Sequence, residues 1–236
     1  MNSTTPLQLL WLLQLSDSGL PIGALSHSYG LETLAAEESL NADQLGLFLN
    51  DYLREFSAFE IPFCGTAYRL GIDNSDGLPI QAWLELNTTL SAFKLAHESR
   101  IASSMLGSRL LRMVSDLMQS QLLLTAFDAA EQTETAIHHC TAFGLAGAAL
   151  GIEEQAVLLA YGHQSLAGLI SASQRLLPVG QSQATRILWE LKPLLAELVK
   201  SAQENHCDVD EARCFAPLIE LASMRHPSLT TRLFIS

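Results

Sequence analysis

Residues that could ligate a metal ion form two groups along the chain. The first is the run His-His-Cys at residues 138–140, and the second comprises His206, Cys207, Asp208 and Cys214. Imidazole and thiolate suit zinc, nickel and copper. However, three consecutive residues of a helix point in directions about 100° apart, and the second group lacks the regular spacing of a metal-binding motif. We therefore expect neither group to form a metal site, and we expect no bound cofactor.

The sequence contains no recognisable nucleotide or nucleophile motif. Residues 144–151 are rich in Gly and Ala, but no Lys-Ser or Lys-Thr follows them, as a phosphate-binding loop requires. Ser28 has Ser26 in the place where a nucleophile elbow has its first glycine. Ser26 and His27 are neighbours in sequence, whereas a catalytic pair needs neighbours in space. A hydrolase that uses Ser26 or Ser28 is therefore a minor alternative.

Residues 15–32 and 223–236 have compositions that are unusual for a connector and for a chain end. The first segment contains three glycines, a proline and four serines, which indicates tight backbone turns. A simple connector with helix caps is the alternative. The second segment ends in Arg-Leu-Phe-Ile-Ser, although chain ends are usually polar. Either the chain's own core or a partner must cover this tail, and the physical argument leaves both open.

Apolar residues recur at helical spacing over most of the chain. We predict helices over residues 42–58, 90–120, 132–150, 152–169, 181–203 and 216–224. Asn41 is the expected N-cap of the first helix, Gly151 ends the third, and residues 73–79 are the clearest loop. These patterns predict an all-α fold, a single domain over residues 1–236 with about eight to ten helices, in which residues 227–236 form a C-terminal tail.

Two of the predicted helices have one face formed by small side chains, which we call the narrow side of the helix. They are Ser99, Ser103 and Gly107 in one helix, and Gly144 and Ala148 in the other. Small side chains at steps of four let another helix approach closely. Such ridges usually pack within one molecule, but they are also candidates for a dimer interface.

Composition excludes several classes of protein. With 25 acidic and 13 basic residues, the net charge of −12 argues against a nucleic-acid binder, which needs a basic face. A hydrophobic fraction of 48% excludes a disordered chain, and 45 Leu against 5 Val favour helices over strands. No apolar run is long enough to span a membrane. A signal peptide has basic residues before its apolar region, but none precedes the apolar residues 7–15 here. We expect a cytoplasmic protein.

Three blocks of sequence resemble, in the same order, motifs of the urease accessory protein UreF family. They are LLQLSDS, LPIG and SHSYGLE within residues 12–32, RLLPVGQS at residues 175–182, and SMRH and TRLF within residues 223–234. The chain departs from the residues usual in the family at Leu25, Pro227 and Ile235.

The resemblance implies an all-helical, non-enzymatic maturation factor that forms a homodimer. Members of the family assemble with the scaffold protein UreD, also called UreH, and with the nickel-carrying GTPase UreG. That assembly acts on apo-urease so that nickel enters its active site, and UreF is expected to couple the GTP state to this delivery.

The resemblance also implies where partners bind. Because the family's tail packs into UreD/UreH, the implied contacts are Arg232, Leu233 and Phe234, with Met224, Arg225 and His226 at the base that positions them. We further expect His27 and Glu32, and Arg175 and Gln181 around the Pro-Gly break, at the face shared with the GTPase or the dimer. A solvated turn is the alternative for Arg175 and Gln181.

A second hypothesis comes from another class of protein. The chain could be a metallochaperone that itself binds nickel or zinc through its seven histidines and four cysteines. Tight metal binding that is lost when His206, Cys207 and Cys214 are replaced would favour it.

Overall fold

The structure is a computed structural model that describes residues 4–72, 77–204, 209, 212 and 216–236. Its elements are α1 (Pro6–Leu15), η1 (Ala24–Ser26), α2 (Leu31–Ala36), α3 (Leu45–Ile72), α4 (Ile80–Phe93), α5 (His97–Met118), α6 (Gln121–Gln132), α7 (His139–Ala149), α8 (Glu154–Leu176), α9 (Gln181–Glu204), α10 (Pro217–Arg225) and η3 (His226–Ser228). The described residues contain no strand, so the all-α prediction is confirmed.

Helix α7 is the centre of the core. All its residues from His139 to Ala148 are buried, and it packs against α3 and α5. A Cβ atom on Gly144 would lie 2.0 Å from the carbonyl oxygen of Cys64, and one on Gly107 would lie 2.2 Å from that of Ile137. Only glycine permits such close approach. The predicted narrow sides therefore exist, and at these two glycines they pack within the chain.

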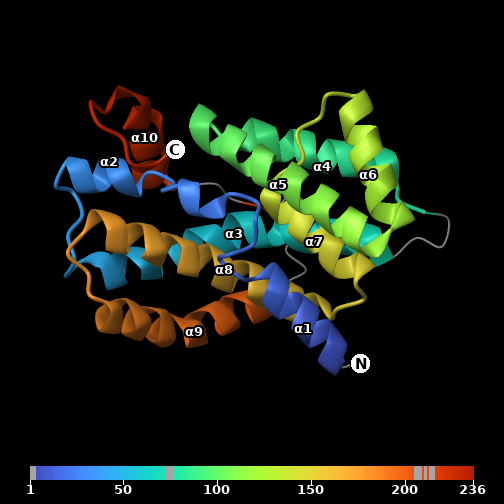
Figure 1. The fold of residues 1–236 in the computed structure, drawn as a ribbon, viewed down its shortest axis with the longest axis horizontal. Coiled ribbons are helices and arrows are strands. Elements are labelled where there is room, and N and C mark those ends of the chain that lie inside the picture. Colours follow the sequence, from blue (N-terminus) through green and yellow to red (C-terminus); the bar gives the residue numbers. More distant parts are fainter. Residues whose placement is uncertain (1–3, 73–76, 205–208, 210–211, 213–215) are drawn as a thin grey trace.

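The remaining helices surround this centre. Helices α8 and α9 pack against each other and against α3, while α10 packs on α2 and on α5. In Figure 1, α10 and the C-terminus lie at the upper left of the molecule, whereas α1 and the N-terminus lie along its lower edge. None of the described helices is long and apolar enough to cross a membrane.

Helix α3 is longer than the predicted helix 42–58. It begins at Leu45 and continues through Pro62 to Ile72. The side chain of Asn41 accepts hydrogen bonds from the backbone N–H groups of Asp43 and Gln44, and thus caps the turn that leads into the helix. The predicted loop 73–79 lies partly outside the described residues.

The predicted helix 90–120 is wrong, because the chain breaks between α4 and α5. At this break Lys94 turns inward, and its Nζ lies 2.5 Å from a carboxylate oxygen of Glu60. The backbone N–H of Ala96 donates to the Glu220 carboxylate at 3.1 Å. Tertiary contacts therefore replace helical ones at a point without Gly or Pro.

The predicted helix 132–150 begins too early. Glu134 has φ 53°, and the hydroxyls of Thr133 and Thr135 lie 2.8 Å apart in a turn that ends α6. Helix α7 starts only at His139. Gly151 ends it with φ 64°, as predicted, and α8, α9 and α10 confirm the last three predicted helices, although α8 runs seven residues further than predicted.

Candidate functional site

The two unusual segments of the sequence contact each other. Gly30 has φ 87°, a left-handed conformation that glycine adopts without strain. A Cβ atom there would lie 2.9 Å from Ser223 Oγ and 3.0 Å from the carbonyl oxygen of Ile219. Gly30 thus both turns the chain into α2 and lets α10 lie directly against it.

The last residues of the chain form hydrogen bonds with residues 26–28. The N–H of Ile235 donates to the Ser26 carbonyl at 2.9 Å. The N–H and the hydroxyl of Ser28 both donate to the main-chain oxygen of Ser236, at 2.5 and 3.0 Å. His27 Nδ1 lies 2.8 Å from the hydroxyl of Ser236. We call residues 26–28, Glu32, Glu98 and Arg175 the tail cradle.

Glu32 is the acidic centre of the tail cradle. Its buried carboxylate accepts the N–H groups of Leu233 at 2.5 Å and Phe234 at 3.0 Å. It also lies 2.9 Å from His226 Nε2. Burial by itself would raise the pKa of this carboxyl, but the bonds from Leu233, His226 and Phe234 outweigh burial and lower it. Glu32 therefore holds the tail as an anion.

His226 links the base of the tail to two carboxylates. Its Nδ1 lies 2.6 Å from Glu98, on the side opposite Glu32, and the side chain is fully buried. Both ring nitrogens of His226 therefore face a carboxylate oxygen. Arg232 donates to the other oxygen of Glu98 at 3.1 Å. His226 and Arg232 thus fix the start of the tail between two carboxylates, those of Glu32 and Glu98.

Arg175 covers the aromatic anchor of the tail. Its guanidinium lies 4.3 Å from the ring centroid of Phe234, which is only 5% exposed. The same guanidinium donates to the Leu25 carbonyl at 2.9 Å. This cation–π contact holds the ring against the N-terminal segment.

The proposed partner residues divide into two sets. His226 and Phe234 are buried within the chain, whereas the remaining four are exposed: Met224, Arg225, Arg232 and Leu233. Among the residues proposed for the GTPase or dimer face, His27 and Glu32 are buried in the tail cradle, while Arg175 and Gln181 are exposed. Gln181 accepts a hydrogen bond from Gln174 at 2.8 Å.

Sequence reasoning missed Glu98 and Ser236. Glu98 lay inside a predicted continuous helix, where a lone acidic residue carries no signal of a tertiary role. Ser236 is the chain's last residue, and nothing local indicates that residues 26–28 bind it. The available signals were the unusual compositions of residues 15–32 and 223–236.

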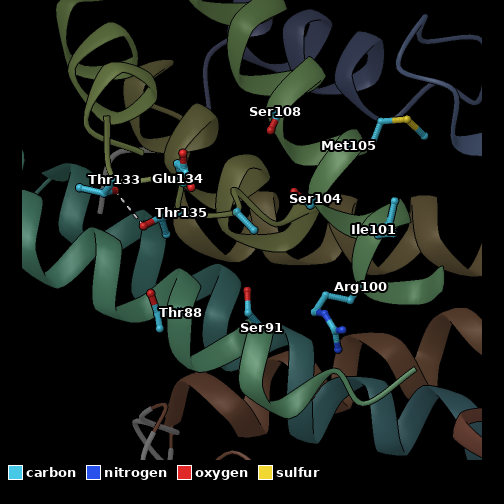
Figure 2. A pocket seen from close by; sticks show the side chains of 11 residues that line it. Thr88, Ser91, Arg100, Ile101, Ser104, Met105, Ser108, Thr133, Glu134 and Thr135 are labelled. Carbon is cyan, nitrogen blue, oxygen red and sulfur yellow. Dashed lines mark hydrogen bonds between the residues drawn. The ribbon is translucent and has the colours of Figure 1, made fainter. Parts of the chain in front are cut away.

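A groove of about 640 Å³ opens on the described surface (Figure 2). It lies between α4, α5 and the connection from α6 to α7, and hydroxyl side chains line it together with Arg100.

Ser91, at the edge of this groove, forms a contact that resembles a nucleophile–base pair. Its Oγ lies 2.7 Å from His138 Nε2. However, burial, followed by the charge of Lys94, lowers the pKa of His138 to about 3. Its second ring nitrogen faces the Ser103 hydroxyl rather than a carboxylate. This histidine is therefore too weak a base for general-base catalysis at neutral pH.

The described side chains among the candidate metal ligands do not point toward a common site. His138 points to Ser91 and Ser103, His139 packs on Tyr161, and burial raises the pKa of the Cys140 thiol. No group of three or more His, Cys, Asp or Glu among the described residues could hold a metal ion. His206, Cys207, Asp208 and Cys214 lie outside those residues. The hydroxyl of Ser28 is bound to the tail.

The described part of the chain is all-helical, and the tail cradle holds one of the chain's own segments. The sequence model of the UreF family matches residues 40–192. The chain is 32% identical to the urease accessory protein UreF of Geobacillus kaustophilus (strain HTA426), over 98% of this chain and 100% of that protein. It is 30% identical to UreF of Bacillus sp. (strain TB-90), over 97% of this chain and 99% of that protein. It is 34% identical to UreF of Picosynechococcus sp. (strain ATCC 27264 / PCC 7002 / PR-6), over 98% of this chain and 100% of that protein. The chain belongs to the UreF family of urease accessory proteins.

Proposed function

We propose that this chain is a non-enzymatic, homodimeric scaffold of urease maturation in the cytoplasm. It binds UreD/UreH and the GTPase UreG, and it couples the GTP state to the insertion of nickel into apo-urease. Membership of the UreF family supports a role in urease maturation. The observation that carries the scaffold function is the way in which the chain presents its C-terminal residues.

The C-terminal residues offer exposed apolar side chains on a fixed support. These are Leu218, Leu221, Met224, Leu233 and Ile235, which are 45% to 62% exposed, and we call them the tail surface. The first three recur every third residue of α10, so they share one face of the helix. A group of exposed apolar side chains, such as the three on this face of α10, is a candidate protein interface. The tail surface is the proposed contact for UreD/UreH.

Within this proposal the partner residues have two different roles. Met224 and Leu233 contact the partner directly, whereas His226, Arg232 and Phe234 fix the tail against the tail cradle. Arg225 pairs with Glu37 at 2.7 Å at the edge of this region. The buried side chains matter because a tail that is already ordered loses less conformational entropy when a partner binds.

The proposed GTPase or dimer face lies around the turn between α8 and α9. Arg175 and Gln181 flank this turn and are exposed. His27 and Glu32 would act on that face through the tail that they hold, because both are buried.

The experiment is light scattering after size-exclusion chromatography of the co-expressed chain, its UreD/UreH partner and its UreG. We expect an assembly with two copies of this chain. The double substitution Met224→Ser and Leu233→Ser, and truncation after His226, should abolish it. The matched control is Leu117→Ser, because Leu117 is 69% exposed and lies near the far end of α5, about 30 Å along the helix from Glu98. A full-length chain that stays monomeric with both partners present contradicts the proposal.

A further inference from the structure

A small cavity lies behind the tail cradle, inside the helical body. It measures about 70 Å³, and its lining includes the polar side chains of His27, Glu60, Lys94, His139, Tyr161 and Gln164. These residues come from the N-terminal segment, α3, the break between α4 and α5, α7 and α8. We call this cavity the polar chamber.

Three buried polar atoms of the polar chamber have no hydrogen-bond partner among the described residues. They are His27 Nε2, His139 Nε2 and Gln164 Oε1. Their side chains belong to residues that are only 3%, 8% and 7% exposed. Proteins rarely leave buried polar atoms unpaired, because such atoms lose their bonds to water without gaining others. Three of them around one cavity indicate a ligand with hydrogen-bonding groups.

The charges around the polar chamber nearly cancel. Glu60 and Lys94 form a close ion pair, and the hydroxyl of Tyr161 donates to the other oxygen of Glu60. Burial lowers the pKa of His27, and it lowers that of His139 to about 4, so both rings are neutral at pH 7. Each neutral imidazole carries one donor and one acceptor. The chamber therefore suits an uncharged molecule that both donates and accepts hydrogen bonds.

The volume of the polar chamber suits a few water molecules. One water occupies about 30 Å³ in the liquid, so the polar chamber has room for at least two, and buried water in proteins bridges polar groups that otherwise have no partner. A divalent cation fits less well, because no three His, Cys, Asp or Glu residues in the described part of the chain are close enough to hold one.

We propose that the polar chamber is a binding site for a cluster of two or more ordered water molecules, which bridge His27, His139 and Gln164 to the Glu60–Lys94 pair. His27 uses its other ring nitrogen to hold the hydroxyl of Ser236. Gln164 uses its amide nitrogen to donate to the Leu15 carbonyl. The water cluster thus connects the last residue of the tail to a buried ion pair in the core. This inference does not depend on the proposed function.

The test uses imidazole ¹⁵N spectra of the full-length chain at pH 7.5, with cross-peaks between ring protons and bound water. We expect His27 and His139 to be neutral and to show cross-peaks to long-lived water. Addition of one equivalent of Zn²⁺ should leave both signals unchanged. Absence of water cross-peaks at both rings overturns the proposal, and so does a shift of both signals with Zn²⁺, which would make the chamber a metal site.

A substitution tests whether the water molecules are shared. In His139→Phe, loss of one partner should weaken the water cross-peak of His27 at least twofold, whereas His97→Phe, on the exposed surface, should leave it unchanged. A His27 cross-peak of full intensity in a folded His139→Phe chain overturns the bridging cluster. Should His139→Phe not fold, Gln164→Met supplies the same comparison.

Discussion

Glu32 accepts three of the hydrogen bonds that hold the tail, so its charge is the first feature to alter. Glu32→Gln keeps the shape of the side chain but removes the anion that faces His226 and two backbone N–H groups. Hydrogen bonds to a charged group contribute about 1.5–3 kcal/mol each. We expect the free energy of unfolding to fall by about 2 kcal/mol, and amide exchange at Leu233 and Phe234 to accelerate at least tenfold.

The matched control is Glu37→Gln. Glu37 lies at the end of the same helix α2 and pairs with Arg225 of α10, but both side chains are substantially exposed. Surface ion pairs contribute about 0–1 kcal/mol, so this variant should retain nearly full stability and a protected tail. Equal protection of Leu233 and Phe234 in both variants would show that Glu32 does not hold the tail.

The buried histidines predict how stability depends on pH. Burial is the largest cause that lowers the pKa of His138 to about 3 and that of His139 to about 4. In the unfolded chain both rings bind a proton near pH 6.5. Stability is therefore complete above pH 6.5 and is lost as pH falls toward the folded values, by about 2 kcal/mol for each ring at pH 5.

Urea unfolding at pH 7.5 and pH 5 measures this loss. We expect a lower midpoint at pH 5, and we expect His139→Phe to remove about 2 kcal/mol of the difference in unfolding free energy between the two pH values. His97→Phe should leave the difference intact, because His97 is exposed. A midpoint that does not change with pH would mean that these rings are protonated in the folded protein.

At the level of the helices, the contact of α7 with α3 depends on one glycine. A Cβ atom on Gly144 would lie 2.0 Å from a backbone oxygen of α3 that cannot move aside alone. Gly144→Ala should therefore cost about 3 kcal/mol or more, at the upper end of what overpacking usually costs. Gly168→Ala in α8 is the control, because nothing lies within 4 Å of its Cβ position. It should stabilise the chain by up to about 1 kcal/mol.

Chemical denaturation of the two variants gives the comparison. A Gly144→Ala chain as stable as the wild type would show that α3 and α7 lie further apart than described. A destabilised Gly168→Ala chain would show that α8 is crowded at this position.

Periodicity predicted the helices whose ends carry local signals. The Pro-Gly break before Gln181, Gly151 after α7 and Pro217 at the start of α10 are such signals, and all three boundaries lie within two residues of the prediction. The break at Lys94 carries none, because its cause is an ion pair with Glu60, 34 residues away.

The tail cradle could not be predicted for the same reason. Both of its segments were unusual in composition, but the contact between Glu32 and Leu233 joins residues 201 positions apart. Composition showed that something must cover the tail. Only the fold shows that much of the cover comes from the chain itself.

For the whole molecule, long-range charge and short-range contact have opposite effects on assembly. Each chain carries a net charge of −12, so two copies repel one another before they touch. The tail surface contains no charged residue, and its contacts therefore depend little on ionic strength. Salt separates these contributions, because it screens charges that are further apart than the Debye length.

We expect salt to strengthen the proposed homodimer, and to weaken a complex with any partner that presents a basic surface to this acidic chain. Raising NaCl from 50 to 500 mM shortens the Debye length from about 14 to about 4 Å, which removes most of the repulsion between two acidic copies. The same change removes the attraction that brings a basic partner to an acidic surface. Sedimentation velocity at both salt concentrations measures the two equilibria. If salt instead dissociates the homodimer, oppositely charged residues must face each other across its interface, and the exposed Arg175 beside the α8–α9 turn becomes the first residue to replace.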